Sequence, residues 1–557
     1  MKYLKMLFKF SLYFAVAFLF HFSGVNSFIT YIEPRHPLRG SRAKPGTPWP
    51  LPQRWIQSQK VLSLNSSNFR ISSNLKDCDV LTAAIQRYEK FIFADVNGTQ
   101  NPLLPTLLQV NVFVNETSCA YPQQGDDEYY LLEISSVKQG VIEARTVWGA
   151  LRALETLSQL VYQNEKTRAY LVNETRIDDW PAYSYRGILI DTARHFIPVS
   201  TLKQNLDAMA FNKMNVFHWH LVDDQSFPFE SKTFPNLSKY GAYSEKQVYS
   251  QTDVKSIIEY ARLRGIRVLP EIDSPGHTKS FGKAYPELLT PCYGYNSSTP
   301  YVPKYPHFSE AETLNPIEEN VYTFMSNLFQ ELKILFPEKY VHLGMDEVYY
   351  ECWESNPNIQ FFMKVNKMQN TSQLEQYYVG RMLQIMKNIG YKYMIWQDPI
   401  DNGVQAADDT IVQIWKDSRL DSKLGEWRES AEIIAKKGYR MVVSACWYLN
   451  YINYPYPGKD WENFYECNPR SFNGSNEEKQ LVLGGEACLW TEFVDSTNLI
   501  SRLWPRASAV AERLWTNPQT ANLDDARFRL DQQRCRLFRR GIPAAPILNG
   551  FCEDYAI

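Results

Sequence analysis

Eight short apolar runs between residues 187 and 487 constrain the fold of this 557-residue chain more than any other feature. They are rich in β-branched and aromatic residues, and stretches with helical spacing separate them, which is typical of βα units and a parallel sheet. Eight such units form a (β/α)8 barrel. A doubly wound open sheet is the alternative, but no GxGxxG or Walker motif begins any of the helical stretches. The runs are Gly187 to Thr192, Val216 to Val222, Ile266 to Ile272, Tyr340 to Met345, Tyr393 to Gln397, Ile411 to Trp415, Met441 to Ala445 and Leu481 to Ala487.

The residues before the barrel predict a smaller α/β domain. Apolar alternation at 107–114 and 129–135 indicates strands. Apolar residues at steps of three and four indicate a helix over 144–162, on the stripe Val147, Leu151, Leu154, Leu157 and Val161. We therefore expect an N-terminal α/β domain over residues 28–180 and the barrel over residues 181–557. The last part of the chain, Asp524 to Arg540, predicts a basic helix with a solvated face.

The N-terminus has the order of residues found in secretory signal peptides. Lys2, Lys5 and Lys9 precede an apolar run from Phe10 to Phe22, and small residues follow it. The run is too short for a comfortable membrane span, and an uncleaved signal anchor is the alternative. No later segment is long and apolar enough to cross a bilayer. We expect a signal peptide over residues 1–27, entry into the secretory pathway, and a lysosomal or extracellular destination.

Sequons and cysteines support that route. Behind a signal peptide, N-x-[ST] sequons are candidate glycosylation sites. They occur at Asn65, Asn97, Asn115, Asn173, Asn236, Asn296, Asn370 and Asn473. The nine cysteines are an odd count, so at least one is unpaired within the chain, and none has metal-type CxxC spacing. In an oxidising compartment the natural local pairs are Cys78 with Cys119, Cys292 with Cys352, and Cys535 with Cys552, with Cys446 and Cys467 left as a possible further pair.

The balance of charge limits the class of partner. Lys and Arg total 59 against 61 Asp and Glu, a formal net charge of -2. No basic field therefore exists to attract nucleic acid or anionic lipid. The substrate predicted from this balance is neutral or small.

The stretch HLGMDEV, His342 to Val348, ends a strand-like run on two adjacent acids, Asp346 and Glu347. Gly344 permits a turn that would bring both carboxylates into one pocket. Two carboxylates pushed together beside apolar surface have their pKa values driven apart, which leaves one able to act as an acid, as in a glycosidase.

Polar residues also follow nearly every other run, at the end of the strands where barrel enzymes build their sites. They are Asp191 with Arg194, Asp223, Asp273 with His277, Asp398, Asp417, Tyr448 and Glu492.

Seven motifs closely resemble the family-20 β-N-acetylhexosaminidases of the eukaryotic lysosomal type. They are RGILIDTARHF, NVFHWHLVDDQSFPFES, LPEIDSPGHT, HLGMDEV, MIWQD, GGEACLWTE and RLWPRASAVAERLW. The resemblance runs from about Trp49 to the C-terminus. It implies an N-terminal α/β domain, a catalytic barrel, and removal of terminal GlcNAc or GalNAc from the non-reducing end of glycans. It also implies a homodimer, with no metal ion and no other cofactor.

The resemblance assigns the chemistry to three residues. Glu347 is expected to be the general acid, held protonated at mildly acid pH by the pocket. The family is an exception to the two-carboxylate scheme, because the substrate's own 2-acetamido oxygen attacks C1. Asp346 then resembles the residue that holds the acetamido nitrogen of the cyclic oxazolinium, and Tyr448 the one that aims the acetamido oxygen.

The remaining candidates resemble the family's sugar pocket. Three tryptophans, Trp396, Trp415 and Trp490, match an aromatic box; Arg194 matches the ligand of O3 and O4, Glu492 that of O4 or O6, and Asn450 the residue near O6. Asp223 and His277 match the pair behind the acid. Other readings stay open: the tryptophans could be core, Arg194 a structural partner of Asp191, and His277 a core histidine.

Two classes of alternative also stay open. His218 and His220 share a strand face near Asp223 and Asp224, which would allow a metal site, although barrel interior explains the histidine pair more simply. The chain could also be an inert sugar-binding protein, or a barrel glycosidase with a carboxylate nucleophile. Inert relatives would be expected to lose Asp346, Glu347 or Tyr448, and this chain has all three.

The chain departs from the family at two places. Lysosomal members carry Asn then Arg after the tyrosine to favour sulfated sugars, or Asp then an apolar residue to favour neutral ones, whereas this chain has Asn450 followed by Tyr451. Without the arginine, the sequence predicts poor activity on 6-sulfated substrates. Met345 stands where many relatives have a second glycine.

Overall fold

The computed structural model describes residues 43–94, 98–135, 139–293, 298–299, 313–420, 423, 425–451, 459–517, 522–548 and 552. The predicted signal peptide and the sequons at Asn97 and Asn296 lie outside these residues. Residues 43–545 form one compact unit. Among the described residues, no helix is long and apolar enough to span a membrane.

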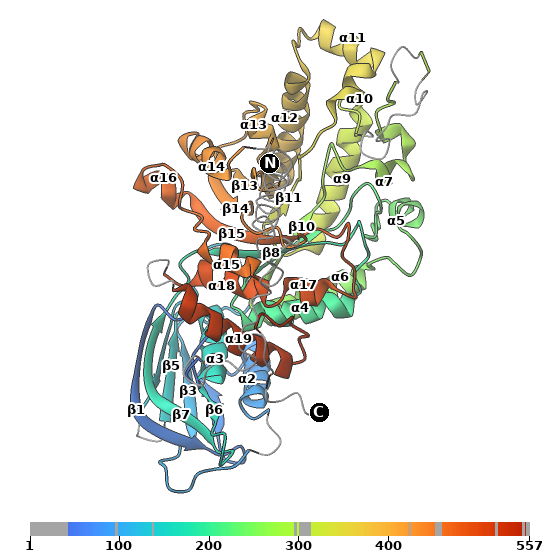
Figure 1. Cartoon of the computed structure of the whole chain (residues 1–557). Helices are drawn as coiled ribbons and strands as arrows, with labels where there is room; N and C mark the ends of the chain where they lie inside the picture. The colour runs from blue at the N-terminus through green and yellow to red at the C-terminus, as the bar shows by residue number, and fades with distance from the viewer. Residues whose placement is uncertain are drawn as a thin grey trace, which may run out of the picture. The chain divides into compact units, whose positions relative to one another are not determined.

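The first part of the unit is a seven-stranded mixed sheet with α2 and α3 on one face (Figure 1). Its strands run in the order β1-β7-β4-β5-β3-β2, with β6 paired to β7. The alternation predicted at 107–114 and 129–135 forms β3 and β4, and the predicted helix forms α3, so these expectations are confirmed. The elements are β1 (Arg54–Leu64), β2 (Arg70–Ser73), α2 (Asp79–Ile92), β3 (Gln109–Val114), β4 (Tyr130–Ile134), β5 (Gln139–Ala144), α3 (Val147–Leu160), β6 (Tyr162–Gln163) and β7 (Tyr170–Asp179).

The second part is a closed barrel of eight parallel strands, ordered as in the chain from β8 to β15. Each of the eight predicted runs overlaps one of these strands, and the bounds differ by at most two residues at the start and three at the end, which confirms the barrel. The strands are β8 (Tyr185–Asp191), β9 (Val216–His220), β10 (Arg267–Glu271), β11 (Tyr340–His342), β12 (Lys392–Trp396), β13 (Ile411–Ile414), β14 (Arg440–Val443) and β15 (Val482–Leu489).

Helices connect the strands, and several of them begin at a capping side chain. A capping box of Ser250 and Asp253 starts α6, and Asn370 caps α12, which ends at Gly390 in the left-handed conformation. The described helices of this part are α4 (Val199–Phe211), α5 (Asn236–Gly241), α6 (Gln251–Arg262), α7 (Lys279–Gly282), the 3-10 turn η1 (Pro286–Leu288), α9 (Glu319–Leu335), α10 (Tyr350–Ser355), α11 (Pro357–Val365), α12 (Thr371–Ile389), α13 (Asp398–Asp401), α14 (Trp427–Lys436), α15 (Asp460–Glu466), α16 (Asn476–Gln480), α17 (Leu499–Leu503), α18 (Arg506–Trp515) and α19 (Leu523–Arg539).

Helix α19 corrects one expectation, because its basic face is not solvated. Arg529 is 3% exposed and forms a two-pronged ion pair with Glu512 of α18, at 2.7 and 2.8 Å. Arg540, which follows the helix, donates to both carboxylate oxygens of Glu155 on α3. Buried acids on two other helices therefore neutralise the arginines. The prediction was wrong because composition alone does not show where those acids lie.

The disulfides agree with the expected local pairs. Cys78 bonds Cys119, Cys292 bonds Cys352, and Cys446 bonds Cys467. Cys535 and Cys552 are each disulfide-bonded, and Cys488 is a buried free cysteine.

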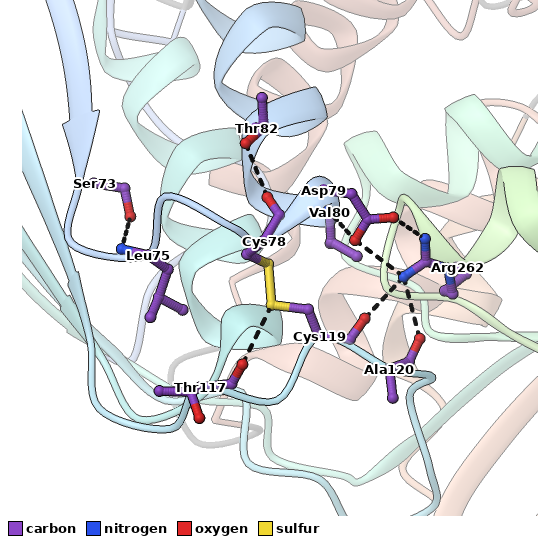
Figure 2. The surroundings of a disulfide bond; sticks show 10 residues. All are labelled: Ser73, Leu75, Cys78, Asp79, Val80, Thr82, Thr117, Cys119, Ala120 and Arg262. Carbon is purple, nitrogen blue, oxygen red and sulfur yellow. Dashed lines mark hydrogen bonds and ion pairs between the residues drawn. A yellow bond between two sulfur atoms is a disulfide. The ribbon is translucent and has the colours of Figure 1, made fainter.

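The Cys78–Cys119 bond lies beside an ion pair that joins the two parts of the unit (Figure 2). Arg262 of α6 pairs with Asp79, the first residue of α2, and donates to the carbonyl oxygens of Cys119 and Ala120. The disulfide thus fixes the chain segments to which Arg262 bonds.

The six described sequon asparagines all reach the surface. Asn115, Asn370 and Asn473 are exposed, and Asn65, Asn173 and Asn236 are half-buried. Glycosylation at these positions stays a prediction.

Candidate active site

One cavity at the carboxyl ends of the barrel strands gathers most of the predicted site residues. It encloses about 500 Å³ of empty space, open to solvent. Of the predicted set, Arg194, Asp223, His277, Asp346, Glu347, Trp415, Tyr448, Asn450, Trp490 and Glu492 line it. Trp396 does not. The cavity walls therefore come from the segments that follow seven of the eight strands, as barrel geometry dictates.

The acid loop after β11 takes an unusual backbone path. Gly344, Met345 and Glu347 have φ values of 67, 74 and 48°, in the left-handed region that side chains other than glycine rarely adopt. A Cβ on Gly344 would lie 1.7 Å from Oδ1 of Asp273, so only glycine fits there. The Met345 N–H donates to the same oxygen at 2.9 Å. This path turns both Asp346 and Glu347 into the cavity, as the sequence predicted for Gly344.

The two acids of the pair sit in different surroundings. The Asp346 side chain is 12% exposed, and burial, then the carboxyl of Asp273, raises its pKa well above the usual range. The Glu347 side chain is 57% exposed, and its contact with His277 at 3.4 Å lowers its pKa. The pKa values are driven apart, as expected. The direction corrects the prediction for Glu347, because in the free pocket the proton is favoured on Asp346.

His277 is the group that sets this direction. Its Nδ1 lies 3.3 Å from Oδ1 of Asp223, and its Nε2 lies 3.8 Å from Oδ2 of Asp346. Burial alone would lower the pKa of His277, but the Asp223 carboxylate raises it well above the usual range. A cationic imidazole beside Glu347 favours the carboxylate form of that acid.

Arg194 lies on the opposite side of Asp223. Its guanidinium contacts Asp223 at 2.9 Å and Asp191 at 3.3 Å, and lies over the ring of Trp490 at 5.2 Å. Arg194 therefore forms the ion pair with Asp191 and also lines the cavity, so the two roles considered for it are compatible. The Nε atom of Arg194 is buried without a hydrogen-bond partner among the described residues.

The aromatic residues form two groups. Trp415 stacks on Tyr448, and Tyr448 stacks on Tyr451, with ring centroids 6.3 Å apart in each pair. The indole N–H of Trp415 donates to Asp398 at 2.7 Å. Trp396, only 1% exposed, lies 6.0 Å from Trp490 and donates to Glu271 at 2.9 Å. Trp396 is therefore a buried core residue beneath the cavity, which is the alternative that the sequence left open for the tryptophans.

Three further residues line the cavity, namely His220, Asp273 and Tyr451. The sequence placed Asp273 at the end of its run and Tyr451 beside Asn450, but neither was among the predicted site residues. For His218 and His220 it offered the barrel interior or a metal site, and their alternation on one strand was the available signal. Beneath them, Glu271 and Glu486 are fully buried, and both lie within the quoted motifs, although the sequence assigned neither a role.

Three groups among the described residues bring potential metal ligands within 4.8 Å of one another. They are His218, Glu271 and His342; Asp223, Asp224 and His277; and Asp273, His277 and Asp346. The expectation that the enzyme uses no metal stays a prediction.

A closed (β/α)8 barrel with paired acids and stacked aromatic rings in one cavity is the arrangement of a barrel glycosidase. Comparison with known proteins gives the family. The model described as "Glycosyl hydrolase family 20, catalytic domain" matches residues 183–518, and "beta-acetyl hexosaminidase like" matches residues 48–160. The chain therefore belongs to glycosyl hydrolase family 20 and is a glycoside hydrolase of the β-hexosaminidase type.

Its relatives match over nearly the whole chain. It is 44% identical to the beta-hexosaminidase subunit beta of Felis catus, over 92% of this chain and 95% of that one. It is also 44% identical to the subunit alpha of Rattus norvegicus, over 91% and 95%. Among solved structures, the chitobiase of Flavobacterium johnsoniae has a TM-score of 0.76 at 30% identity, covering 91% of this chain and 74% of that one.

Proposed function

We propose that this chain is an exo-acting, retaining β-N-acetylhexosaminidase that releases terminal GlcNAc or GalNAc by substrate-assisted catalysis. The observation that carries the proposal is that the two acids of the pair, Asp346 and Glu347, lie in different surroundings. Glu347 is exposed at the cavity mouth, where a leaving group would lie, while Asp346 is buried with its Oδ1 unpartnered among the described residues. A buried acceptor of this kind suits a substrate N–H rather than attack on C1.

Glu347 would donate its proton to the glycosidic oxygen as the acetamido oxygen forms a bond to C1 and the C1–O bond breaks. Water then attacks C1 of the oxazolinium from the face of the departed group while the bond between C1 and the acetamido oxygen breaks. Glu347 accepts the proton of the water, the 2-acetamido group is regenerated, and the β configuration is retained. Tyr448 would hold the acetamido oxygen in line with C1.

Substrate binding would shift the shared proton of the acid pair from Asp346 to Glu347. In the free pocket the proton is favoured on Asp346 and disfavoured on Glu347. The acetamido N–H, and the positive charge that develops on it, would favour an ionised Asp346. The sugar would cover Glu347 and raise its proton affinity. Both effects move the proton to the residue that must donate it.

The test compares an aryl N-acetyl-β-glucosaminide with the matching aryl β-glucoside. Substrate assistance predicts that only the first is cleaved at a useful rate, because the glucoside has no 2-acetamido group. Comparable rates on both would overturn the mechanism in favour of an enzyme nucleophile. No cleavage of either would favour an inert sugar-binding protein.

Specificity for uncharged sugars follows from the rim of the cavity. Tyr451 follows Asn450 in the cavity lining, and its pKa is raised by burial first and then by the carboxylates of Glu492 and Glu347. A 6-sulfate near Asn450 would meet these carboxylates, and Tyr451 stands at the position where the resemblance would place an arginine in sulfate-favouring enzymes. A 6-sulfated aryl substrate should therefore be cleaved at least about tenfold less efficiently than the neutral one, a difference of about 1.4 kcal/mol. Equal kcat/KM values would contradict this.

The disulfides are typical of a protein that folds in the secretory pathway. We propose a lysosomal or extracellular destination and a homodimeric state. Light scattering on the purified secreted protein tests the assembly, and a monomer at working concentration would contradict it.

A further inference from the structure

A continuous row of acids and imidazoles joins the centre of the barrel to Glu347. Its members come from β9, β10, β15 and the loops after β9, β10 and β11. The contacts are Glu486 to His218 at 2.8 Å, His218 to Glu271 at 3.1 Å, Glu271 to His220 at 2.6 Å, His220 to Asp223 at 2.8 Å, Asp223 to His277 at 3.3 Å and His277 to Glu347 at 3.4 Å. Only the last two contacts belong to the pair already expected behind the acid.

His220 is the central link, and its surroundings fix its protonation state. Its Nδ1 faces Oε2 of Glu271 and its Nε2 faces Oδ2 of Asp223, both within hydrogen-bond distance. Carboxylate oxygens accept hydrogen bonds, so each ring nitrogen must donate, and the ring is an imidazolium. Burial would lower the pKa of His220, but Glu271 and Asp223 raise it to about 10.

Glu271 is correspondingly held as an anion. Besides His220, it lies 3.1 Å from Nε2 of His218 and accepts the indole N–H of Trp396 at 2.9 Å. It is fully buried, and among the described residues His220 is the cavity-lining residue with which its side chain forms an ion pair. Glu271 also lies 3.1 Å from Nδ1 of His342, but among these partners His220 is the one that lines the cavity, so a buried anion here can act on the site by holding the His220 imidazolium in place.

Asp223 connects His220 to His277, because its carboxylate contacts both imidazole rings. One of its oxygens binds His220 and Arg194, and the other accepts from His277 and from the backbone N–H of Asp224. With both oxygens occupied, the carboxylate cannot rotate without breaking several charge-assisted hydrogen bonds. His277 is thereby held with Nδ1 toward Asp223 and Nε2 toward Glu347.

We propose that His220 and Glu271 are positioning residues for the acid of this enzyme, acting on Glu347 through Asp223 and His277. This inference rests on the proposed function, in which Glu347 donates the proton. Neither residue touches the reacting atoms. Their role is to keep His277 oriented so that Glu347 meets the glycosidic oxygen with its proton in place.

The test uses the dependence on leaving group, because help from an acid matters for a basic leaving group and little for an acidic one. His220→Phe keeps a buried ring and removes both hydrogen bonds. We expect its kcat on chitobiose, whose leaving group is a weakly acidic hydroxyl of the second sugar, to fall about 10- to 100-fold. On the dinitrophenyl N-acetyl-β-glucosaminide, the fall should be less than about threefold.

Trp219→Phe is the matched control. Trp219 is the neighbouring residue on β9, is fully buried, and points to the opposite face of the strand, where its indole N–H donates to Thr192. Any loss of activity in this variant should be the same on both substrates. An equal loss on both substrates in His220→Phe would show a general packing effect and overturn the inference.

A double variant tests the route. If His220 acts through His277, then His220→Phe should cost almost nothing further in a His277→Phe background. Independent, multiplicative losses would overturn the route. If His220→Phe does not fold, His220→Gln serves instead, since the amide can still reach Asp223. It should show a smaller loss with the same dependence on leaving group, and a loss without that dependence would overturn the inference.

The outcomes separate this inference from the proposed function. A wild-type enzyme that cleaves neither substrate contradicts the proposed function itself. A wild-type enzyme that cleaves both, with a leaving-group-dependent loss in Glu347→Gln but none in His220→Phe, contradicts only the positioning role.

Discussion

The two ends of the barrel interior are built on opposite principles. Toward the start of the strands, each strand contributes one apolar residue to a hydrophobic cluster, here called the apolar layer, formed by Tyr185, Val216, Leu269, Tyr340, Met394, Ile411, Val442 and Leu483. Toward the carboxyl ends, buried charged and polar groups form what we call the ionic end, which includes His218, His220, Glu271 and Glu486 and lies beside the cluster of Leu189, Trp396, Cys488 and Trp490. On β9 the change occurs within one strand, where Val216 is followed by His218 and His220 on the same face.

The difference separates what holds the barrel together from what it does. Apolar burial is favourable wherever the side chains fit. The ionic end gains little from burial, because each charge loses its hydration and must recover it from partners. Glu486 shows how fully this is done: it accepts from Tyr185 at 2.6 Å, His218 at 2.8 Å and Gln413 at 2.7 Å. We infer that these buried charged residues serve to orient the side chains of the cavity above them.

The largest expected effect is at the top of the ionic end. Glu347→Gln should lower kcat on chitobiose by about 10²- to 10⁴-fold, the usual contribution of a general acid. Stability should change little, since the side chain is mostly in solvent. Steady-state kinetics and a melting curve measure both. Glu351→Gln, an exposed acid on the following helix, is the control and should retain wild-type turnover. Near wild-type turnover in Glu347→Gln would refute the assignment of the acid.

The next effect compares the two ends on one strand. Met394 belongs to the apolar layer, whereas Trp396, two residues later on β12, donates to Glu271 of the ionic end. Met394→Ala should lower the free energy of unfolding by about 2–5 kcal/mol through the cavity it leaves, with kcat and KM unchanged.

Trp396→Phe keeps most of the buried ring but removes the donor to Glu271. It should cost about 1.5–3 kcal/mol, as expected for a hydrogen bond to a charged group, and should also lower kcat/KM. Denaturant unfolding and kinetics on both variants decide the matter. If Met394→Ala impaired catalysis while Trp396→Phe did not, the proposed division of the barrel would be wrong.

The apolar end was predictable from sequence, and the ionic end was predictable only in part. Eight runs of β-branched and aromatic residues predicted the strands because burial on both sides of a parallel sheet demands such runs. Barrel geometry then placed Arg194, Glu347 and Glu492 at the same end, although they are far apart in the chain. These expectations depend on local pattern and on topology, both of which the sequence carries.

What the sequence could not show depends on partners from distant strands. The pKa of Glu347 follows from His277, which another loop places beside it. The charge on His220 follows from Glu271 on the neighbouring strand. Trp396 lies near the end of its predicted run, as Trp415 does, but its indole donates to Glu271 and it does not line the cavity. In each case the sequence drew attention to the residue itself. Its partners come from other strands and loops, and the sequence does not show how those strands align.

The strain in the acid loop was likewise invisible in the sequence. Met345 occupies a left-handed conformation at φ 74° while fully buried, where many relatives have a glycine. A backbone outlier of this kind costs about 1–3 kcal/mol and persists only where packing imposes it. Here the bond from its N–H to Asp273 and the close approach of Gly344 impose it.

A third prediction concerns pH, to which the ionic end should respond and the apolar layer should not. The pKa is raised to about 6 for Asp224 and about 8 for Asp273, chiefly by burial. For His218, where burial lowers the pKa, Glu486 and Glu271 raise it to about 9. Each group holds a proton in the folded state that the unfolded chain releases at lower pH. The free energy of unfolding should therefore fall as pH rises.

The fall should amount to about 2 kcal/mol or more between pH 5 and pH 8, measured by denaturant unfolding. Below about pH 4 stability should fall again, because the pKa values of Asp223 and Glu271 are lowered in the folded state, so the unfolded chain takes up protons that the folded protein does not. Maximum stability near neutral or alkaline pH would contradict this account.

The smallest expected effect isolates one buried acid away from the cavity. Glu375 on α12 is fully buried and accepts from Tyr350 and Asn402, yet burial raises its pKa to about 7. Its unfolded pKa is near 4.5. Glu375→Gln should match the wild type below about pH 4.5, since both side chains are then neutral. It should become more stable than the wild type by about 1–3 kcal/mol as pH rises to 7, and the difference should then stay constant.

Activity at pH 5 should be unchanged in Glu375→Gln, because this residue has no contact with the cavity lining among the described residues. If the variant still showed the full wild-type decline in stability between pH 4.5 and 7, Glu375 would not be a source of the pH dependence. The whole decline would then have to come from the groups beneath and around the cavity. That outcome would sharpen the contrast between the two ends of the barrel, because only the end that carries the chemistry would sense pH.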